Sequence, residues 1–173
     1  MMPGPENYAA IERLRDGRSI NVRALSTDDK DDMLFAIGRT GRGSLQRRFF
    51  VPKRNFSEKE IAFFMNIDFV NHVALIALAE EDGREVIIGG SRYIVTEPGI
   101  AEIAFVVIDD YQGQGLGTLL MRHLAILARR AGLTWLVAEV LPENTAMRKV
   151  FGKFGFQTRQ GGDPQVAHLA LRL

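Results

Sequence analysis

The chain has 173 residues and a mass of 19.3 kDa, which suits one domain with a single hydrophobic core and excludes two large domains. Hydrophobic residues make up 46% of the chain and charged residues 25%, a composition typical of a folded protein rather than a disordered one. Twenty-two basic and 21 acidic side chains leave a net charge of +1, so no overall charge favours nucleic acid or an anionic membrane as a partner. Cysteine is absent, which excludes disulfides, thiolate metal sites and a cysteine nucleophile that would carry an acyl group.

The first 18 residues are rich in proline and glycine and end near the turn-forming pair Asp16-Gly17. We therefore expect 1–18 to be a loose lead-in and 19–173 to form one domain. The start of the chain has neither a basic leader nor an apolar run, so it is not typical of a signal peptide. No stretch reaches the roughly 18 apolar residues of a membrane helix, and we expect a cytoplasmic protein without a membrane partner.

Hydrophobic periodicity predicts regular elements from residue 19 onward. In chain order we expect a strand at 19–25, a helix from 26 to about 37, a second helix after Ser57, strands at 72–80, 86–96 and 101–109, a helix beyond Gly117, a strand at 135–141, a helix from Asn144 to about 154, and a strand at 166–173. This order predicts an α+β fold of three layers (α/β/α), in which helices flank a mixed, mainly antiparallel central sheet.

The most informative segment is a glycine-rich sequence between an apolar strand and an amphipathic helix, QGQGLGT at 112–118. Glycines let backbone N–H groups converge on one point, and a helix N-terminus attracts anions, so the segment predicts a phosphate-binding loop. Residues 111–138 contain no Asp or Glu, although acids are favoured in the first turn of a helix. Thr118 stands where a P-loop would have lysine and a dinucleotide fingerprint its last glycine. A glycine-rich turn without a ligand is the alternative.

The loop matches the pattern [Q/R]xxGx[G/A] of the GNAT superfamily of acyl-CoA-dependent N-acetyltransferases, which the chain resembles. FVVIDD before the loop and ENTAMRKVFGKFGF after it fall where that superfamily has its fourth strand and its final helix. LRDG, INVR, SLQRRFF, VALIAL and AEIAFVV extend the resemblance, from about residue 11 to 156, to the acetyltransferase domain of bacterial protein lysine acetyltransferases, which modify acyl-CoA synthetases. The resemblance implies the GNAT fold and acetyl-CoA as the co-substrate.

The resemblance also implies where acetyl-CoA binds. The pyrophosphate would lie on Gln112, Gly113, Gln114, Gly115, Leu116, Gly117 and Thr118, and the pantetheine arm would pair with the backbone of Phe105, Val106 and Val107. Asn144 would lie beside the cofactor, with a simple helix N-cap as the alternative role.

Glu102 is the candidate general base. Its AEI segment matches the strand that carries the base in the lysine acetyltransferases, and the apolar neighbours Ile103 and Phe105 predict a setting that would raise its pKa. A lysine acceptor, with an ordinary pKa of ~10.4, must lose a proton before it attacks. The alternative is an exposed strand carboxylate without a catalytic role.

The leaving thiolate has no evident acid. Many family members have a tyrosine seven residues after the asparagine, where this chain has Phe151, and the lysine acetyltransferases also tend to lack that tyrosine. Protonation by water, protonation by Tyr93 or Tyr111, and unassisted departure of the thiolate all stay open.

Two further groups of residues, the basic residues at 39–54 and the histidines, have side chains that could bind a ligand. The chain's one basic cluster comprises Arg39, Arg42, Arg47, Arg48, Lys53 and Arg54, and it is either a solvated face or a surface that docks an acidic protein or the 3′-phosphate of CoA. The three histidines are scattered without metal-ligand spacing, so we expect no metal site.

We expect an acetyl-CoA-dependent N-acetyltransferase that works by direct transfer, since no cysteine is available to carry the acetyl group. A protein lysine is the expected acceptor, with acyl-CoA synthetases as the expected class of protein. Acetylation of a small amine and a catalytically silent CoA-binding regulator are the alternatives. The oligomeric state stays open, and a homodimer is one option.

Overall fold

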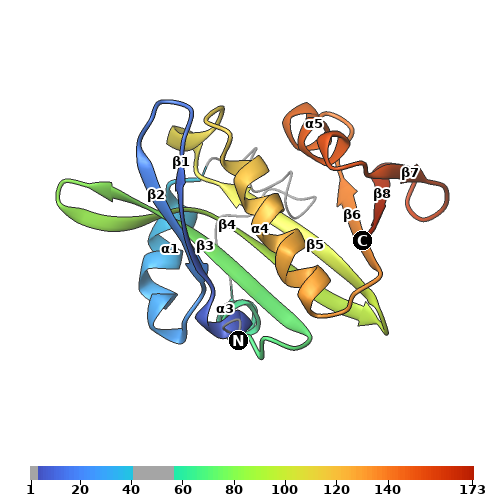
Figure 1. Ribbon diagram of the computed structural model, residues 1–173, viewed down its shortest axis with the longest axis horizontal. Coiled ribbons are helices and arrows are strands. Elements are labelled where there is room, and N and C mark those ends of the chain that lie inside the picture. The colour runs from blue at the N-terminus through green and yellow to red at the C-terminus, as the bar shows by residue number, and fades with distance from the viewer. Residues whose placement is uncertain (1–3, 41–56) are drawn as a thin grey trace.

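The computed structural model describes residues 4–40 and 57–173. These residues form one eight-stranded sheet in the order β1-β2-β3-β4-β5-β6-β8-β7 (Figure 1). The strands are Ala9–Arg13 (β1), Ser19–Ala24 (β2), His72–Glu81 (β3), Arg84–Glu97 (β4), Ile100–Val107 (β5), Trp135–Val140 (β6), Gln157–Arg159 (β7) and Ala167–Arg172 (β8). Only β5 and β6 pair in parallel, so the sheet is mixed and mainly antiparallel, as predicted.

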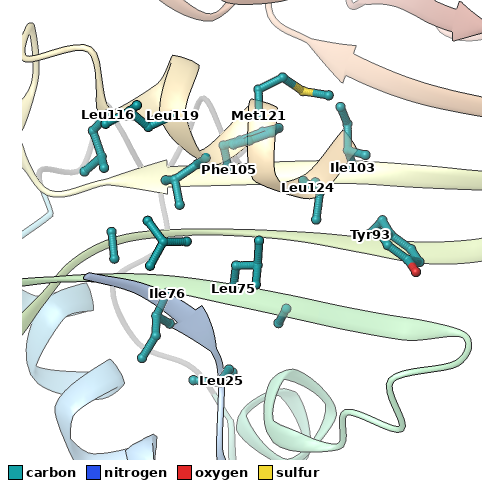
Figure 2. Packing of buried hydrophobic residues seen from close by; sticks show 14 of the residues in the cluster. Leu25, Leu75, Ile76, Tyr93, Ile103, Phe105, Leu116, Leu119, Met121 and Leu124 are labelled. Atoms are coloured by element: carbon teal, nitrogen blue, oxygen red, sulfur yellow. The ribbon is translucent and has the colours of Figure 1, made fainter. Parts of the chain in front are cut away.

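The helices are Lys30–Gly38 (α1), Glu58–Met65 (α3), Leu116–Arg130 (α4) and Thr145–Lys153 (α5), with 3-10 turns at Pro5–Asn7, Thr27–Asp29 and Asp109–Tyr111. Figure 2 shows α4 on one side of the sheet and α1 and α3 on the other. In Figure 1, α5 lies beside β6 and β7. The predicted three-layer α+β architecture is confirmed.

Helix α4 has the sequence features that a helix covering a sheet requires. Leu116, Leu120, Leu124 and Leu127 recur every three or four residues and are buried. The first turn contains no acid, while arginines in the last turn complement the helix dipole. Ile103 and Phe105 of β5 point toward this helix (Figure 2), so β5 and α4 are held together by the main core.

The expectation of a loose lead-in over 1–18 is wrong for the described part of that segment, because it contains strand β1. Tyr8 and Leu14 are buried, and β1 pairs along its length with β2. Glu12 Oε1 accepts a hydrogen bond of 2.8 Å from Nε2 of His123 on α4, and the Tyr8 hydroxyl bonds to Nδ1 of the same ring. Residues 8–14 therefore belong to the folded sheet.

The parallel pair β5 and β6 separates after three residues. Ile100, Ala101 and Glu102 pair with residues 135–137 of β6, and the rest of β5 has no partner on that side in the described residues. This gap opens toward the loop before α4 and toward α5, and it positions the site described below.

A candidate cofactor and acceptor cavity between two strands

A cavity of about 470 Å³ lies where β5 and β6 separate. Its walls are residues 102–107 of β5, the glycine loop and first turn of α4, the end of β6, and residues 144–153 at α5. Side chains from both faces of β5 line the cavity, because consecutive strand residues point to opposite faces. The cavity therefore passes around the unpaired edge of β5, from the α4 side of the sheet to the α1 side.

The glycine loop forms the end of the cavity nearest α4. Gly113 and Gly115 have φ values of +79° and +85°, in the left-handed region that favours glycine. Gly115 is the N-cap of α4 and makes no side-chain cap, so N–H groups of the first turn have no partner within the helix. Converging N–H groups at the start of a 15-residue helix can hold an anion.

Six of the seven residues predicted in this loop line the cavity, and Gln114 does not. The carbonyl of Gln114 instead accepts a hydrogen bond of 3.1 Å from the Arg15 backbone. Leu116 lines the cavity but is 99% buried, so only its backbone can serve a ligand. The Gln112 side chain donates to the Val107 carbonyl at 3.3 Å, which ties the loop to the end of β5.

The backbone of β5 offers hydrogen-bonding groups to the cavity at alternate residues. The Gly99 carbonyl accepts from the Trp135 N–H of β6 at 3.0 Å, so alternation directs the N–H and C=O groups of Phe105 and Val107 toward the gap. The Val106 carbonyl faces β4, since it lies 2.9 Å from where a Cβ on Gly89 would be. Of the three predicted backbone ligands, Phe105 and Val107 thus present their amide groups to the cavity, and Val106 contributes its side chain.

Glu102 is the last residue of β5 that pairs with β6, and it lies at the end of the cavity opposite the glycine loop. Its side chain is exposed and points to the α1 face, whereas Ile103 and Phe105 are buried on the α4 face. The apolar enclosure expected from those neighbours is therefore wrong, because strand alternation puts them behind the carboxylate. A carboxylate in this position can accept a proton or form an ion pair with an ammonium group.

Asn144 performs the capping role and also lines the cavity. Its Oδ1 accepts from the Met147 N–H at 3.3 Å as the N-cap of α5, and the residue is 92% buried. Further along α5, Phe151 is buried in the cavity wall against Phe105, with ring centroids 5.8 Å apart. The ring that replaces the tyrosine of other family members therefore serves packing.

The two candidate tyrosines differ in their relation to the cavity. Tyr93 does not line the cavity, and burial raises its pKa to about 12. Tyr111 precedes the glycine loop, and its hydroxyl donates to Glu81 at 2.7 Å; burial, followed by the Glu81 contact, raises its pKa. Of the two tyrosines, only Tyr111 lines the cavity, and which group protonates the thiolate stays a prediction.

The structure adds four charged residues that the sequence did not single out. Arg15, from the turn between β1 and β2, reaches the loop, and Lys149 and Lys153 of α5 also line the cavity. Glu139 of β6 also lines the cavity, two residues beyond Val137, which is the partner of Glu102, so the register places both carboxylates on one face of the sheet. Its Oε1 lies 3.7 Å from Nδ1 of His168. Sequence patterns signal elements and motifs, whereas these residues come together only through the tertiary fold.

The predictions about the basic cluster, a metal site and a membrane helix concern other parts of the chain. Of the basic cluster, only Arg39 lies in the described residues, where it binds Glu81 and Asp110; Arg42, Arg47, Arg48, Lys53 and Arg54 lie outside them. Residues 4–40 and 57–173 contain no group of three or more His, Cys, Asp or Glu side chains placed to hold a metal ion. No helix in the same ranges is long and apolar enough to cross a membrane.

Comparison with known proteins identifies the family. The model of the acetyltransferase (GNAT) family matches residues 44–156. "Acetyltransferase PA5475" of Pseudomonas aeruginosa is 35% identical over 161 residues, which cover 91% of this chain and 87% of that protein. "Acetyltransferase Pat" of Mycolicibacterium smegmatis is 28% identical over 145 residues, covering 83% of this chain but 43% of Pat.

A solved structure agrees over the whole chain. The crystal structure of the GNAT domain of S. lividans PAT superposes with a TM-score of 0.89 at 32% identity, and each chain is covered completely. The glycine loop, the gap between β5 and β6 and the family match converge on one conclusion: the chain belongs to the acetyltransferase (GNAT) family of acyltransferases, whose co-substrate is acetyl-CoA.

Proposed function

We propose that acetyl-CoA lies along the cavity, with its pyrophosphate on residues 112–118, its pantetheine arm in the gap between β5 and β6, and its thioester near Glu102. Three features of the cavity fit the molecule. The loop and helix N-terminus supply N–H donors for phosphate oxygens. The amide groups of Phe105 and Val107 supply partners for the amides of pantetheine, and the apolar wall at Phe105, Val150 and Phe151 suits its methylene groups.

Glu102 is the proposed general base. It accepts a proton from the acceptor ammonium, directly or through one water, and the neutral nitrogen attacks the thioester carbonyl carbon. A backbone N–H on the open edge of β5 stabilises the negative charge that develops on the carbonyl oxygen. The C–N bond forms, the C–S bond breaks, the attacking nitrogen loses its second proton to water, and the CoA thiolate takes up a proton from water.

The proposed acceptor is a lysine side chain of a protein, and the cytoplasm is the proposed location. The observation that carries the acceptor is the pair of carboxylates, Glu102 and Glu139, which line the cavity on one face of the sheet. Opposite charges attract, so these carboxylates favour the ammonium group of a lysine over a neutral or anionic acceptor. The chain is also similar to two proteins named Acetyltransferase Pat and PAT, in line with the resemblance of its sequence to bacterial protein lysine acetyltransferases.

Labelling of a host lysate tests the acceptor. Purified protein and acetyl-CoA are added to a lysate depleted of endogenous acetyltransferases, and acetylated lysines are counted by mass spectrometry beside a Glu102→Gln sample. Labelling of a few lysines, in acyl-CoA synthetases above all, that depends on Glu102 supports the proposal. Labelling equal to that of the variant, together with turnover of small amines such as polyamines, contradicts a protein acceptor.

A further inference from the structure

The turn between β1 and β2 brings an arginine to the phosphate end of the cavity. Arg15 lines the cavity and donates from Nη1 to the Gly113 carbonyl at 3.2 Å. Its backbone N–H donates to the Gln114 carbonyl at 3.1 Å, so the turn is fixed against the glycine loop by two hydrogen bonds. The side chain and backbone of one residue therefore bind two successive carbonyls of the loop.

The charge of Arg15 is not balanced by a carboxylate in the described residues. Nearby Asp16 is bound by Arg18, whose Nε lies 2.8 Å from Oδ2. Within the described residues, the guanidinium of Arg15 makes only the hydrogen bond to Gly113, and a guanidinium has five N–H donors. Most of its donors are thus available to a ligand in the cavity.

Arg15 and the start of α4 face the same point. A Cβ placed on Gly115 would lie 3.5 Å from Nε of Arg15, so the guanidinium stands beside the N-cap of the helix. Partnerless N–H groups of the first helical turn and a planar cation are the two kinds of donor that phosphate oxygens prefer.

We propose that Arg15 is a cofactor-binding residue that contacts the pyrophosphate of acetyl-CoA beside the N-terminus of α4. This inference rests on the proposed placement of the pyrophosphate on residues 112–118. The pyrophosphate, rather than the 3′-phosphate, is the target because Arg15 touches Gly113 and stands beside Gly115, both within the loop itself.

The test compares three acetyl donors that lose phosphates in turn: acetyl-CoA, acetyl-dephospho-CoA and S-acetyl-pantetheine. We expect Arg15→Gln to raise the Kd and KM of both phosphate-bearing donors about tenfold, the size of one charge-assisted hydrogen bond, and to leave S-acetyl-pantetheine unchanged. The effect on acetyl-CoA shrinks at high salt, since the contact is electrostatic. Arg15→Lys keeps the positive charge but not the planar, bidentate guanidinium, so we expect its affinity to lie between those of Arg15→Gln and the unaltered protein.

Arg13→Gln is the matched control, because Arg13 lies on the same hairpin, donates to the Gly17 carbonyl and does not line the cavity. If Arg15→Gln weakened the binding of S-acetyl-pantetheine as much as that of acetyl-CoA, Arg15 would only support the conformation of the loop. If it weakened the binding of acetyl-CoA alone, Arg15 would contact the 3′-phosphate. Either result overturns the proposal, as does an Arg15→Gln variant whose affinity for acetyl-CoA and whose Tm are both unchanged. If the unaltered protein binds acetyl-CoA no better than S-acetyl-pantetheine, the placement of the pyrophosphate itself fails.

Discussion

Glu102 shows how strand alternation decides the role of a single residue. Its apolar neighbours pack against α4, while its own side chain emerges on the α1 face at the mouth of the gap. The carboxylate is therefore in contact with solvent and accessible to an acceptor amine. Proton transfer by such a group contributes typically 10²–10⁴-fold to a rate, so its removal has a measurable signature.

We expect Glu102→Gln to lower kcat on a lysine peptide by about 100-fold, because the amide cannot accept the proton. The Kd of acetyl-CoA stays within twofold, since Glu102 lies away from the phosphate loop. Steady-state thiol release and calorimetry measure the two quantities, and Glu97→Gln, at the exposed end of β4, is the control. An unchanged kcat in the variant would exclude Glu102 as the base.

At the scale of elements, the anion site depends on the conformation of the loop and the start of α4. Gly115 needs a positive φ to turn the chain into the helix, and Gly132 has a similar φ of +79° after the other end of the same helix. No atom lies within 4 Å of a Cβ built on Gly132. The two glycines therefore share a backbone conformation that strains any other residue, but only Gly115 lines the cavity.

Gly115→Glu should reduce acetyl-CoA affinity by at least 100-fold, because the side chain brings bulk and negative charge to the phosphate end. Gly132→Glu imposes the same left-handed strain away from the cavity and should leave the affinity nearly unchanged. Calorimetric titration of both variants separates the site from general destabilisation. Equal affinities in the two variants would remove the loop from the cofactor site.

How far the sequence predicted the elements depends on how strongly each is patterned. Helix α4 and the long strands β3, β4 and β5 were predicted to within a few residues, because buried faces impose a clear hydrophobic period. The edge strand β1 was missed because its hydrophobicity does not follow its burial: Ile11 is 76% exposed, whereas Glu12 is half-buried. The three residues of β7 are all exposed, and they were missed because no alternation marks them.

The site was predicted where a local motif encodes it. The glycine loop and Asn144 combine a turn conformation with a ligand position within a few residues, and the structure places all but Gln114 of these residues on the cavity. Arg15 reaches the cavity from the turn between β1 and β2 and Glu139 from β6, and only the tertiary fold brings these two residues to the glycine loop and β5.

At the scale of the whole molecule, a polar network joins elements around the cofactor end. Glu81 at the end of β3 accepts hydrogen bonds from Arg39, which caps α1, and from Tyr111, which precedes the glycine loop. Arg39, followed by Tyr111, holds the pKa of Glu81 below its ordinary value of 4.5. The network therefore ties both layers of helices to one strand end.

This network predicts acid sensitivity. A carboxyl group whose pKa is lowered by folding stabilises the protein above its unfolded pKa, and that contribution disappears as the pH falls through the folded pKa. We expect Glu81→Gln to lower the free energy of unfolding by about 1 kcal/mol at pH 6, with a smaller difference from the unaltered protein below pH 4. Urea unfolding between pH 3 and 6 measures this, with the exposed neighbour Glu80 changed to Gln as control. A difference that does not vary with pH would contradict the assignment.

A crystal structure of the protein with acetyl-CoA tests the central claim, that one cavity joins a phosphate loop to a catalytic carboxylate across the edge of β5. We predict the pyrophosphate on the N–H groups of residues 113–118, the pantetheine amides on Phe105 and Val107, and the thioester at the Glu102 end. A cofactor bound elsewhere, or bound with its thioester at the glycine loop, would contradict the account.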